Sequence, residues 1–234
     1  MSTTPPAAPR ELRRDARANR ERILAAAREA FAESGMDAGM DEIARRAGVG
    51  VGTIYRRFPT KEALAEAILE DKLAAVGAMI DRALEADDPG EGLRGFFAEV
   101  ARRHAEDRSG AAALASCARP DAGASPGETR LRVRLDELLR RAQRAGAVRP
   151  DIRLGDLMAL LWGLGRVVAV TADAAPGYAE RYTALVMDAL AVAGPAALPG
   201  RPLSAAQITA GSRAAMATAA GIRPRPQRVP AARS

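Results

Sequence analysis

Residues 47–64 read AGVGVGTIYRRFPTKEAL, and this stretch decides the fold and most of the function. Three alternate glycines, Gly48, Gly50 and Gly52, come just before Thr53. Glycines at similar spacings occur in loops that bind the phosphates of a nucleotide, and such a loop would indicate an enzyme. The same residues also suit a sharp turn between two short helices, the second of which presents side chains to DNA.

The residues before the glycines argue against a nucleotide-binding loop. Such a loop follows a buried β-strand and opens a long helix. Here the glycines follow DEIARRA (41–47), which has helical periodicity and two arginines instead of a run of β-branched residues. No lysine of the P-loop type stands beside Thr53. We therefore interpret the stretch as a helix-turn-helix.

The helix-turn-helix interpretation explains where the helices of this stretch begin and end. Gly48 makes the turn with a positive φ, and Gly50 caps the following short helix at about 51–57. Pro59 ends that helix because it disfavours helical geometry at the residue before it. Glycine inside a helix costs about 1 kcal/mol relative to alanine, so Gly52 indicates that another group approaches closely there.

The short helix is expected to have an inner and an outer face. Ile54 and Phe58 lie four residues apart and should face the core. An exposed tyrosine beside two arginines suits contacts to phosphates and base edges. Lys61 opposes the dipole at the start of the next helix, which a bound phosphate would explain. The residues expected to point outward are Val51, Thr53, Tyr55, Arg56 and Arg57.

Composition favours helices and an uneven distribution of charge. Aromatic residues make up 3% of the 234 residues, which suits an all-α fold better than a sheet. Residues 1–61 carry twelve basic and eight acidic residues, and residues 62–194 carry seventeen and twenty-one. Residues 195–234 carry six arginines and no acid. A basic N-terminal region and an acidic middle suit a protein whose N-terminal part meets phosphates.

The sequence lacks the features that identify several other classes of protein. The single cysteine, Cys117, cannot form an intramolecular disulfide, and the polar first residues do not resemble a signal peptide. Arg166 interrupts the apolar stretch 157–170, which is short for a membrane span. The sequence has no HExxH or GxSxG motif, and one histidine and one cysteine make a poor metal site. We expect a cytoplasmic protein that is not an enzyme, without cofactor, metal or membrane contact.

Breaks in the helical pattern divide the chain. Residues 1–10 are expected to be a disordered leader, and residues 11–60 a three-helix DNA-binding domain. Residues 61–194 are expected to form a helical domain, and residues 195–234 a disordered basic tail with few bulky apolar residues. The helix expected at 61–85 is about 37 Å long and therefore long enough to join the two domains.

Residues 22–69 resemble the TetR family of bacterial transcriptional regulators. The resemblance rests on EIARRAGV (42–49) and GTIYRRFPTKEAL (52–64) within this stretch. It implies an all-helical C-terminal domain for ligand binding and dimerisation. It also implies a major-groove helix with backbone contacts around it. The implied DNA-binding residues are Gly39, Met40, Gly50, Val51, Gly52, Thr53, Tyr55, Arg56, Arg57 and Lys61.

The chain departs from the family pattern at three of these positions. Gly39 stands where a capping threonine or serine is usual, and Gly50 and Val51 replace a common serine and lysine. Fewer contacts are therefore expected from that end of the interface. Arginines before the first apolar stripe either supply compensating phosphate contacts or form an ordinary solvated helix face. These arginines are Arg13, Arg14, Arg17 and Arg20.

Two C-terminal helices are expected to form a dimer interface. The helix at about 154–172 is apolar nearly all round, which requires burial on two sides. The helix at about 178–193 carries one apolar stripe. Two such helices per chain suit a four-helix bundle across a two-fold axis, whereas the alternative is that both belong to the core of one chain. The expected interface residues are Leu157, Leu161, Leu164, Val168, Tyr182, Leu185, Val186 and Ala189.

The C-terminal domain also contains candidates for a small-molecule pocket. Arg166 is the strongest of them, because a buried arginine within an apolar run needs an anionic partner. That partner is either a ligand carboxylate or a glutamate or aspartate of the other subunit. The alternative for His104 is a position at the surface. The alternative for Met158 and Trp162 is an ordinary place in the core. The full set of candidates is Phe96, Phe97, Val100, His104, Cys117, Met158, Trp162 and Arg166.

These observations predict a DNA-binding regulator that responds to a small molecule. We expect a homodimeric repressor that binds a palindromic double-stranded operator and is released by an inducer. A helical adaptor protein that binds another protein is the alternative. That alternative leaves Tyr55, Arg56, Arg57 and Lys61 without a role.

Overall fold

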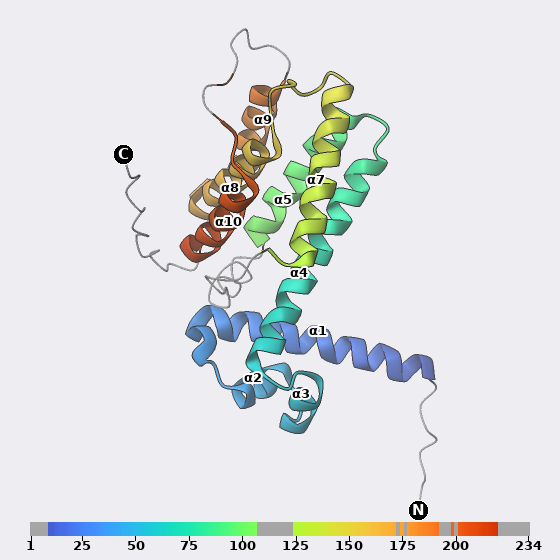
Figure 1. Cartoon of the computed structure of the whole chain (residues 1–234). Coiled ribbons are helices and arrows are strands. Elements are labelled where there is room, and N and C mark those ends of the chain that lie inside the picture. Colours follow the sequence, from blue (N-terminus) through green and yellow to red (C-terminus); the bar gives the residue numbers. More distant parts are fainter. Residues whose placement is uncertain are drawn as a thin grey trace, which may run out of the picture.

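All regular structure in the described residues is helical (Figure 1). The computed structural model describes residues 9–106, 124–171, 174–175, 177–191, 198 and 201–219. Its elements are α1 (Pro9–Ser34), the 3-10 helix η1 (Gly35–Asp37), α2 (Met40–Ala47), α3 (Val51–Arg57), α4 (Lys61–Glu85), α5 (Pro89–Glu106), α7 (Pro126–Arg144), α8 (Leu154–Thr171), α9 (Tyr178–Leu190) and α10 (Ala205–Ala219). The predicted all-α fold class is confirmed.

The N-terminal domain consists of α1, η1, α2, α3 and the start of α4 around a small core. Phe31, Ile43, Ile54 and Leu64, one from each of the four α-helices, are fully buried in that core. The spacing of three or four residues between apolar side chains on α1 and α2 forms the stripes that meet there. Helix α3 contributes Ile54 to this core and keeps its other side at the surface.

The turn between α2 and α3 has the predicted geometry. Gly48 has a φ of 63°, in the left-handed region that favours glycine. Gly50 precedes α3 in an extended conformation, and Phe58 is extended before Pro59. The Thr60 hydroxyl accepts a hydrogen bond from the backbone N–H of Ala63 at 3.1 Å, which caps α4.

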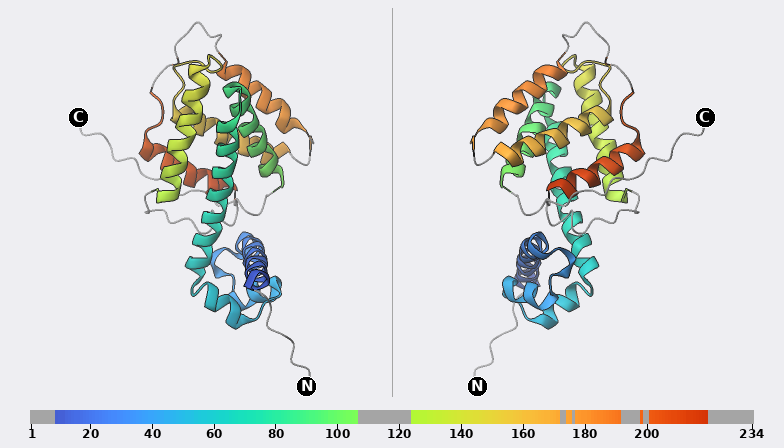
Figure 2. Two further views of the ribbon diagram at one scale, coloured as in Figure 1. Left: turned by 90° about the vertical axis from the view of Figure 1, so that its right-hand side faces the viewer. Right: turned by 90° about the vertical axis from the view of Figure 1, so that its left-hand side faces the viewer.

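Helix α4 continues from the N-terminal domain into the C-terminal bundle (Figures 1 and 2). Near its middle, Asp71 accepts hydrogen bonds from Arg28 and, at 3.4 Å, from Arg20, both on α1. At its upper end, Arg134 of α7 forms an ion pair with Asp81. One uninterrupted helix is thus attached by charged pairs to both domains.

The C-terminal bundle packs α4, α5, α7, α8, α9 and α10 around a second core. Phe97, Leu138 and Leu157 are fully buried there. Helices α4 and α5 approach so closely that a Cβ on Gly92 would stand 2.3 Å from the Ala83 carbonyl oxygen. This close approach explains why a glycine stands in the first turn of α5.

Helix α8 is apolar on several sides, but only part of this surface is buried within the chain. By length and composition alone, Leu154–Thr171 is a candidate for crossing a membrane. In the structure α8 contacts α5, α9, α10 and α7 within the bundle. One helix of this length and composition is weak evidence for a membrane span, and its outer side keeps exposed apolar surface at Val170.

Two of the expected segment boundaries are wrong. The leader was expected to extend to residue 10, but α1 begins at Pro9, a residue that suits the first turn of a helix. The tail was expected to be unstructured from residue 195, but Ala205–Ala219 forms α10. Residues 1–8 and 220–234 lie outside the described residues.

Helix α10 is stabilised by contacts with α8 and α7. Ile208 is buried, and Arg132 of α7 donates a hydrogen bond to the Thr209 hydroxyl at 2.9 Å. A Cβ on Gly211 would stand 2.4 Å from the ring of Trp162, so the helix lies directly on that indole. Figure 2 shows α10 (red) crossing the end of the bundle nearer the N-terminal domain.

Candidate nucleic-acid interface

Helix α3 presents one face to solvent and one to the core, as the spacing predicted. Ile54 and Phe58 are buried, whereas Tyr55 is 45% exposed. Arg56 and Arg57 follow it and are exposed as well. Within the residues that the structure describes, no ion pair engages either of these arginines. The outer face of α3 therefore combines an aromatic ring with two uncompensated positive charges.

The start of α3 is open to the approach of a large partner. Val51 is 44% exposed, Gly50 and Gly52 are exposed, and Thr53 is half-buried. A Cβ on Gly52 would meet nothing within 4 Å. Packing within the chain therefore does not require glycine at this position.

The N-terminus of α2 holds two of the predicted DNA-binding residues. Gly39 is exposed and provides no side-chain cap, so the first N–H groups of α2 face outward without one. Met40 is 5% exposed and belongs to the N-terminal core, so its side chain cannot contact DNA. The expectation for Met40 is wrong for the side chain, because the first position of α2 already faces inward.

Lys61 has a structural partner in this conformation. Its Nζ donates a hydrogen bond to the backbone carbonyl of Met36 at 3.0 Å. This bond joins the start of α4 to the turn η1 after α1. Contact between Lys61 and a phosphate, which the sequence predicts, requires the ammonium group to share or exchange this bond.

The arginines of α2 differ from those of α3 because they are paired within the domain. Arg46 donates to both carboxylate oxygens of Glu33, at 2.9 and 2.7 Å, and to Glu42 at 2.7 Å. The Arg46 hydrogen bonds lower the pKa of Glu33 and of Glu42, and Arg45 contributes to the lowering at Glu42. These pairs hold α1 against α2 and leave α3 as the part of the motif with available cations.

The pocket candidates do not form one cavity. Phe97 and Val100 lie in the bundle core, where the rings of Phe96 and Phe97 meet edge to face. Met158 and Trp162 are half-buried. Arg166 is exposed in the single chain, because its side of α8 faces outward, and its place in a pocket stays a prediction. Cys117 lies outside the described residues.

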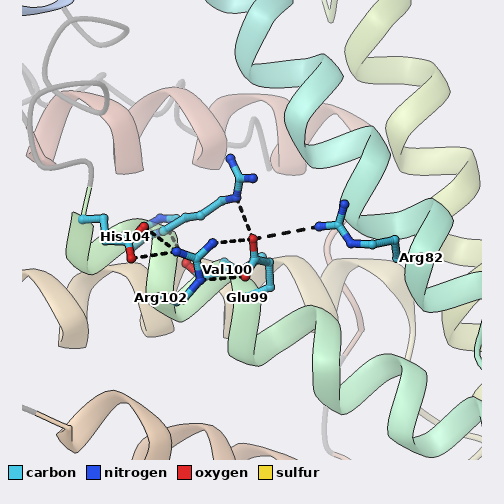
Figure 3. Close-up of polar contacts among 7 residues, drawn as sticks. Arg82, Glu99, Val100, Arg102 and His104 are labelled. Carbon is cyan, nitrogen blue, oxygen red and sulfur yellow. Dashed lines mark hydrogen bonds and ion pairs between the residues drawn. The ribbon is translucent and has the colours of Figure 1, made fainter.

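A polar cluster lies on α5 beside His104 (Figure 3). Glu99 accepts hydrogen bonds from Arg102 and Arg103, and Arg82 of α4 stands 3.9 Å away. The hydrogen bonds from Arg102 and then Arg103 lower the pKa of Glu99 to about 2. The His104 ring packs over Gly165 of α8, where a Cβ would stand 2.7 Å from it.

An open hollow lies next to this cluster. It has a volume of about 340 Å³ and lies between α4 and α5. Phe96 is the one predicted pocket residue that lines it, together with Arg82, Glu91 and Glu99 among others. The sequence did not indicate this site, because its residues come from two helices and share no motif.

The predicted dimer residues separate into two groups. Leu157, Leu164, Val168 and Val186 are buried within the single chain, so the expectation that they lie in an interface is wrong. They face α5 and the rest of the bundle core. The members of the set that keep exposed or half-buried surface are Leu161, Tyr182, Leu185 and Ala189.

An apolar surface nevertheless remains on α8 and α9. Leu185 is 51% exposed, Val170 58% and Tyr178 37%, and the two helices pack side by side. Val170 was not predicted, because a helix that is apolar nearly all round does not reveal which side stays outside. We name Val170, Tyr178, Tyr182, Leu185 and Ala189 the α8–α9 face.

The fold and the exposed helix α3 together define a DNA-binding protein of the helix-turn-helix class with a separate helical domain. Residues 23–68 match the family model described as bacterial regulatory proteins, tetR family. Residues 88–192 match the C-terminal domain described as transcriptional regulator SbtR-like. The chain belongs to the TetR family of transcriptional regulators.

Solved structures and sequence relatives agree with this assignment. A TetR transcriptional regulator from Streptomyces coelicolor is 34% identical with a TM-score of 0.53, covering 79% of this chain and 99% of that one. A TetR transcription regulatory protein from Mycobacterium vanbaalenii is 42% identical with a TM-score of 0.50, covering 69% and 97%. An HTH-type transcriptional regulator of Staphylococcus aureus (strain USA300) is 38% identical over 63 residues, which span 26% of this chain and 34% of that protein.

Proposed function

We propose that the protein is a homodimeric repressor that binds a palindromic operator through α3 and is released by a small molecule. The observation that carries the proposal is the outer face of α3, where Tyr55, Arg56 and Arg57 are exposed. Arginine side chains form bidentate hydrogen bonds with guanine and also contact phosphates, and an aromatic ring packs against base edges or sugars. Such a helix is free to enter the major groove.

The response to a ligand rests on α4. This helix lines the 340 Å³ hollow with Met79, Arg82 and Ala83, and about two to three turns earlier Asp71 accepts hydrogen bonds from α1. A ligand that moves α4 therefore changes the position of α3. In a dimer the two recognition helices must fit half-sites about 34–36 Å apart, so a shift of a few ångströms is enough to lower affinity.

Binding to DNA from the upstream region of the protein's own gene tests the proposal. Fluorescence anisotropy is measured at several salt concentrations, with a shuffled duplex as competitor. We expect binding that resists the competitor, with two chains per duplex. Arg56→Ala should weaken specific binding by about 1–3 kcal/mol and relax the preference at one base position.

A matched variant separates this effect from a general loss of charge. Arg140 of α7 is exposed and lies on the opposite domain, so Arg140→Ala removes the same charge far from α3. We expect Arg140→Ala to bind like the unmodified protein. Equal affinity of both variants, or equal competition by the shuffled duplex, contradicts the proposed interface.

A further inference from the structure

The first part of α1 extends beyond the N-terminal domain (Figure 1). The first buried residue of α1 among those whose burial is described is Ile23. Residues 14–22 are exposed except for Asn19 and Arg20, which are half-buried. The match to the N-terminal family model also begins at residue 23, so it does not cover this segment. We name residues 9–22 the α1 arm.

The α1 arm is strongly basic. It contains six arginines and three acidic residues, whereas the remaining twelve residues of α1 carry one arginine and two glutamates. Arg13, Arg17 and Arg20 follow one another at intervals of four and three residues and continue the line of Leu24. Of these, Arg17 is exposed, whereas Arg20 is half-buried and donates a hydrogen bond to Asp71 of α4.

Stability of the fold does not account for this charge. Arg20 reaches α4 through its hydrogen bond to Asp71, and the Arg22 guanidinium lies beside Gly48 at the end of α2. Arg17 pairs with Glu21 at 2.9 Å within the arm, and both side chains are more than half exposed. Exposed pairs of this kind contribute little to stability and are readily replaced by another anion. A polar helix without a packed face therefore suits a partner outside the chain.

We propose that the α1 arm binds the phosphate backbone of duplex DNA that flanks the sequence contacted by α3. This inference rests on the proposed function, because it requires DNA under α3. Fourteen helical residues extend about 21 Å, and phosphates follow one another at about 3.4 Å intervals along each strand of a duplex, so the arm spans several of them. The net positive charge of a projecting helix complements a polyanion that continues past the domain.

The test compares a short and a long duplex that share the same central site. The site is selected by the full-length protein from a random pool, and the long duplex adds about ten base pairs of arbitrary sequence on each side. The arm variant carries Arg13→Gln, Arg14→Gln and Arg17→Gln, which leave Arg20 and its contact to α4 in place. The control variant carries Arg94→Gln, Arg140→Gln and Arg144→Gln, which remove three exposed arginines from the C-terminal domain.

We expect the unmodified protein and the control variant to bind the long duplex more tightly than the short one. The arm variant should bind the short duplex normally and lose the gain from the flanks. Its salt dependence on the long duplex should flatten by about 0.9 per lost phosphate contact in a plot of log K against log salt. Scrambling the flanks should change nothing, because phosphate contacts do not depend on sequence.

The outcomes separate the arm from the function on which it rests. Equal binding of the arm and control variants to both duplexes overturns the arm proposal while the regulator proposal stands. A flank gain that disappears when the flanks are scrambled also overturns it, since base contacts then explain the gain. Failure of the unmodified protein to select any site overturns the proposed function, and the arm proposal with it.

Discussion

Substitution of Gly52 tests whether DNA approaches the backbone of α3. A Cβ at this position meets nothing in the free protein, so Gly52→Ala should leave stability unchanged or raise it by up to about 1 kcal/mol. If DNA lies against α3, the added methyl group stands in its way. We expect a loss of affinity of about tenfold, or about 1.4 kcal/mol, by anisotropy on the selected site.

A second glycine provides the control for this substitution. Gly95 lies in α5, is exposed, and also has nothing within 4 Å of the place of its Cβ. Gly95→Ala should gain the same helix stability in thermal unfolding and leave DNA binding unchanged. If Gly52→Ala binds like Gly95→Ala, DNA does not come close to the start of α3.

At the level of residues, spacing predicted orientation well where a helix has one packed face. Ile54 and Phe58 point inward as expected, because α3 contacts the core on one side alone. Spacing did not settle the position of Arg166, which is exposed in the single chain although its neighbours in the sequence are apolar. It also failed to find the bond from Lys61 to Met36, because a backbone carbonyl leaves no mark in the sequence.

At the level of elements, the helices around strong stop signals could be predicted closely. Gly48, Pro59 and Thr60 set the ends of α2, α3 and α4, and α4 has the bounds that the pattern predicts. Helix α10 could not be predicted, because its sequence AAQITAGSRAAMATA has few bulky apolar residues. Its stability comes from Ile208 and from contact with Trp162, which no local pattern reveals.

Removal of α10 should therefore be costly, whereas removal of the residues after it should not. Truncation after Gly194 exposes the apolar surface under Ile208, and burial of one such side chain contributes about 1.5–3 kcal/mol. We expect a lower free energy of unfolding and a red-shifted emission of Trp162, the only tryptophan of the chain. Truncation after Ala219 removes four arginines and keeps α10, so its emission should stay unchanged.

The point variant Gly211→Leu makes the same test without shortening the chain. Its side chain would collide with the Trp162 ring, so α10 should separate from α8 and the emission should shift as in the longer truncation. Unchanged emission in both variants would mean that α10 does not cover the indole in solution.

At the level of the whole molecule, the two domains need a second copy to act on a palindrome. A single chain presents one α3 to one half-site, and two half-sites linked by a dimer bind far more tightly than either alone. The α8–α9 face is the exposed apolar surface that this arrangement can use, since Leu157 and the other inward residues already belong to the core of one chain. Its partly apolar, partly aromatic character is typical of an interface.

Leu185→Arg tests this arrangement, because it places a charge in the middle of the α8–α9 face, where Leu185 is 51% exposed. Burying an unpaired charge in an interface costs several kcal/mol, so we expect a monomer in analytical ultracentrifugation. Binding to the full operator should fall by about 2 kcal/mol or more, whereas binding to an isolated half-site should not change.

The matched control for the dimer is Val133→Arg on α7. Val133 is 65% exposed and lies on another helix, so the same change of residue there should leave a dimer that binds the operator normally. A monomeric Val133→Arg and a dimeric Leu185→Arg would place the interface on α7 instead. Circular dichroism and thermal unfolding of both variants show that each chain remains folded, which is expected because each substituted side chain points into solvent in the single chain. The loss at the full operator then measures how much of the affinity depends on the second subunit and not on the contacts of one α3.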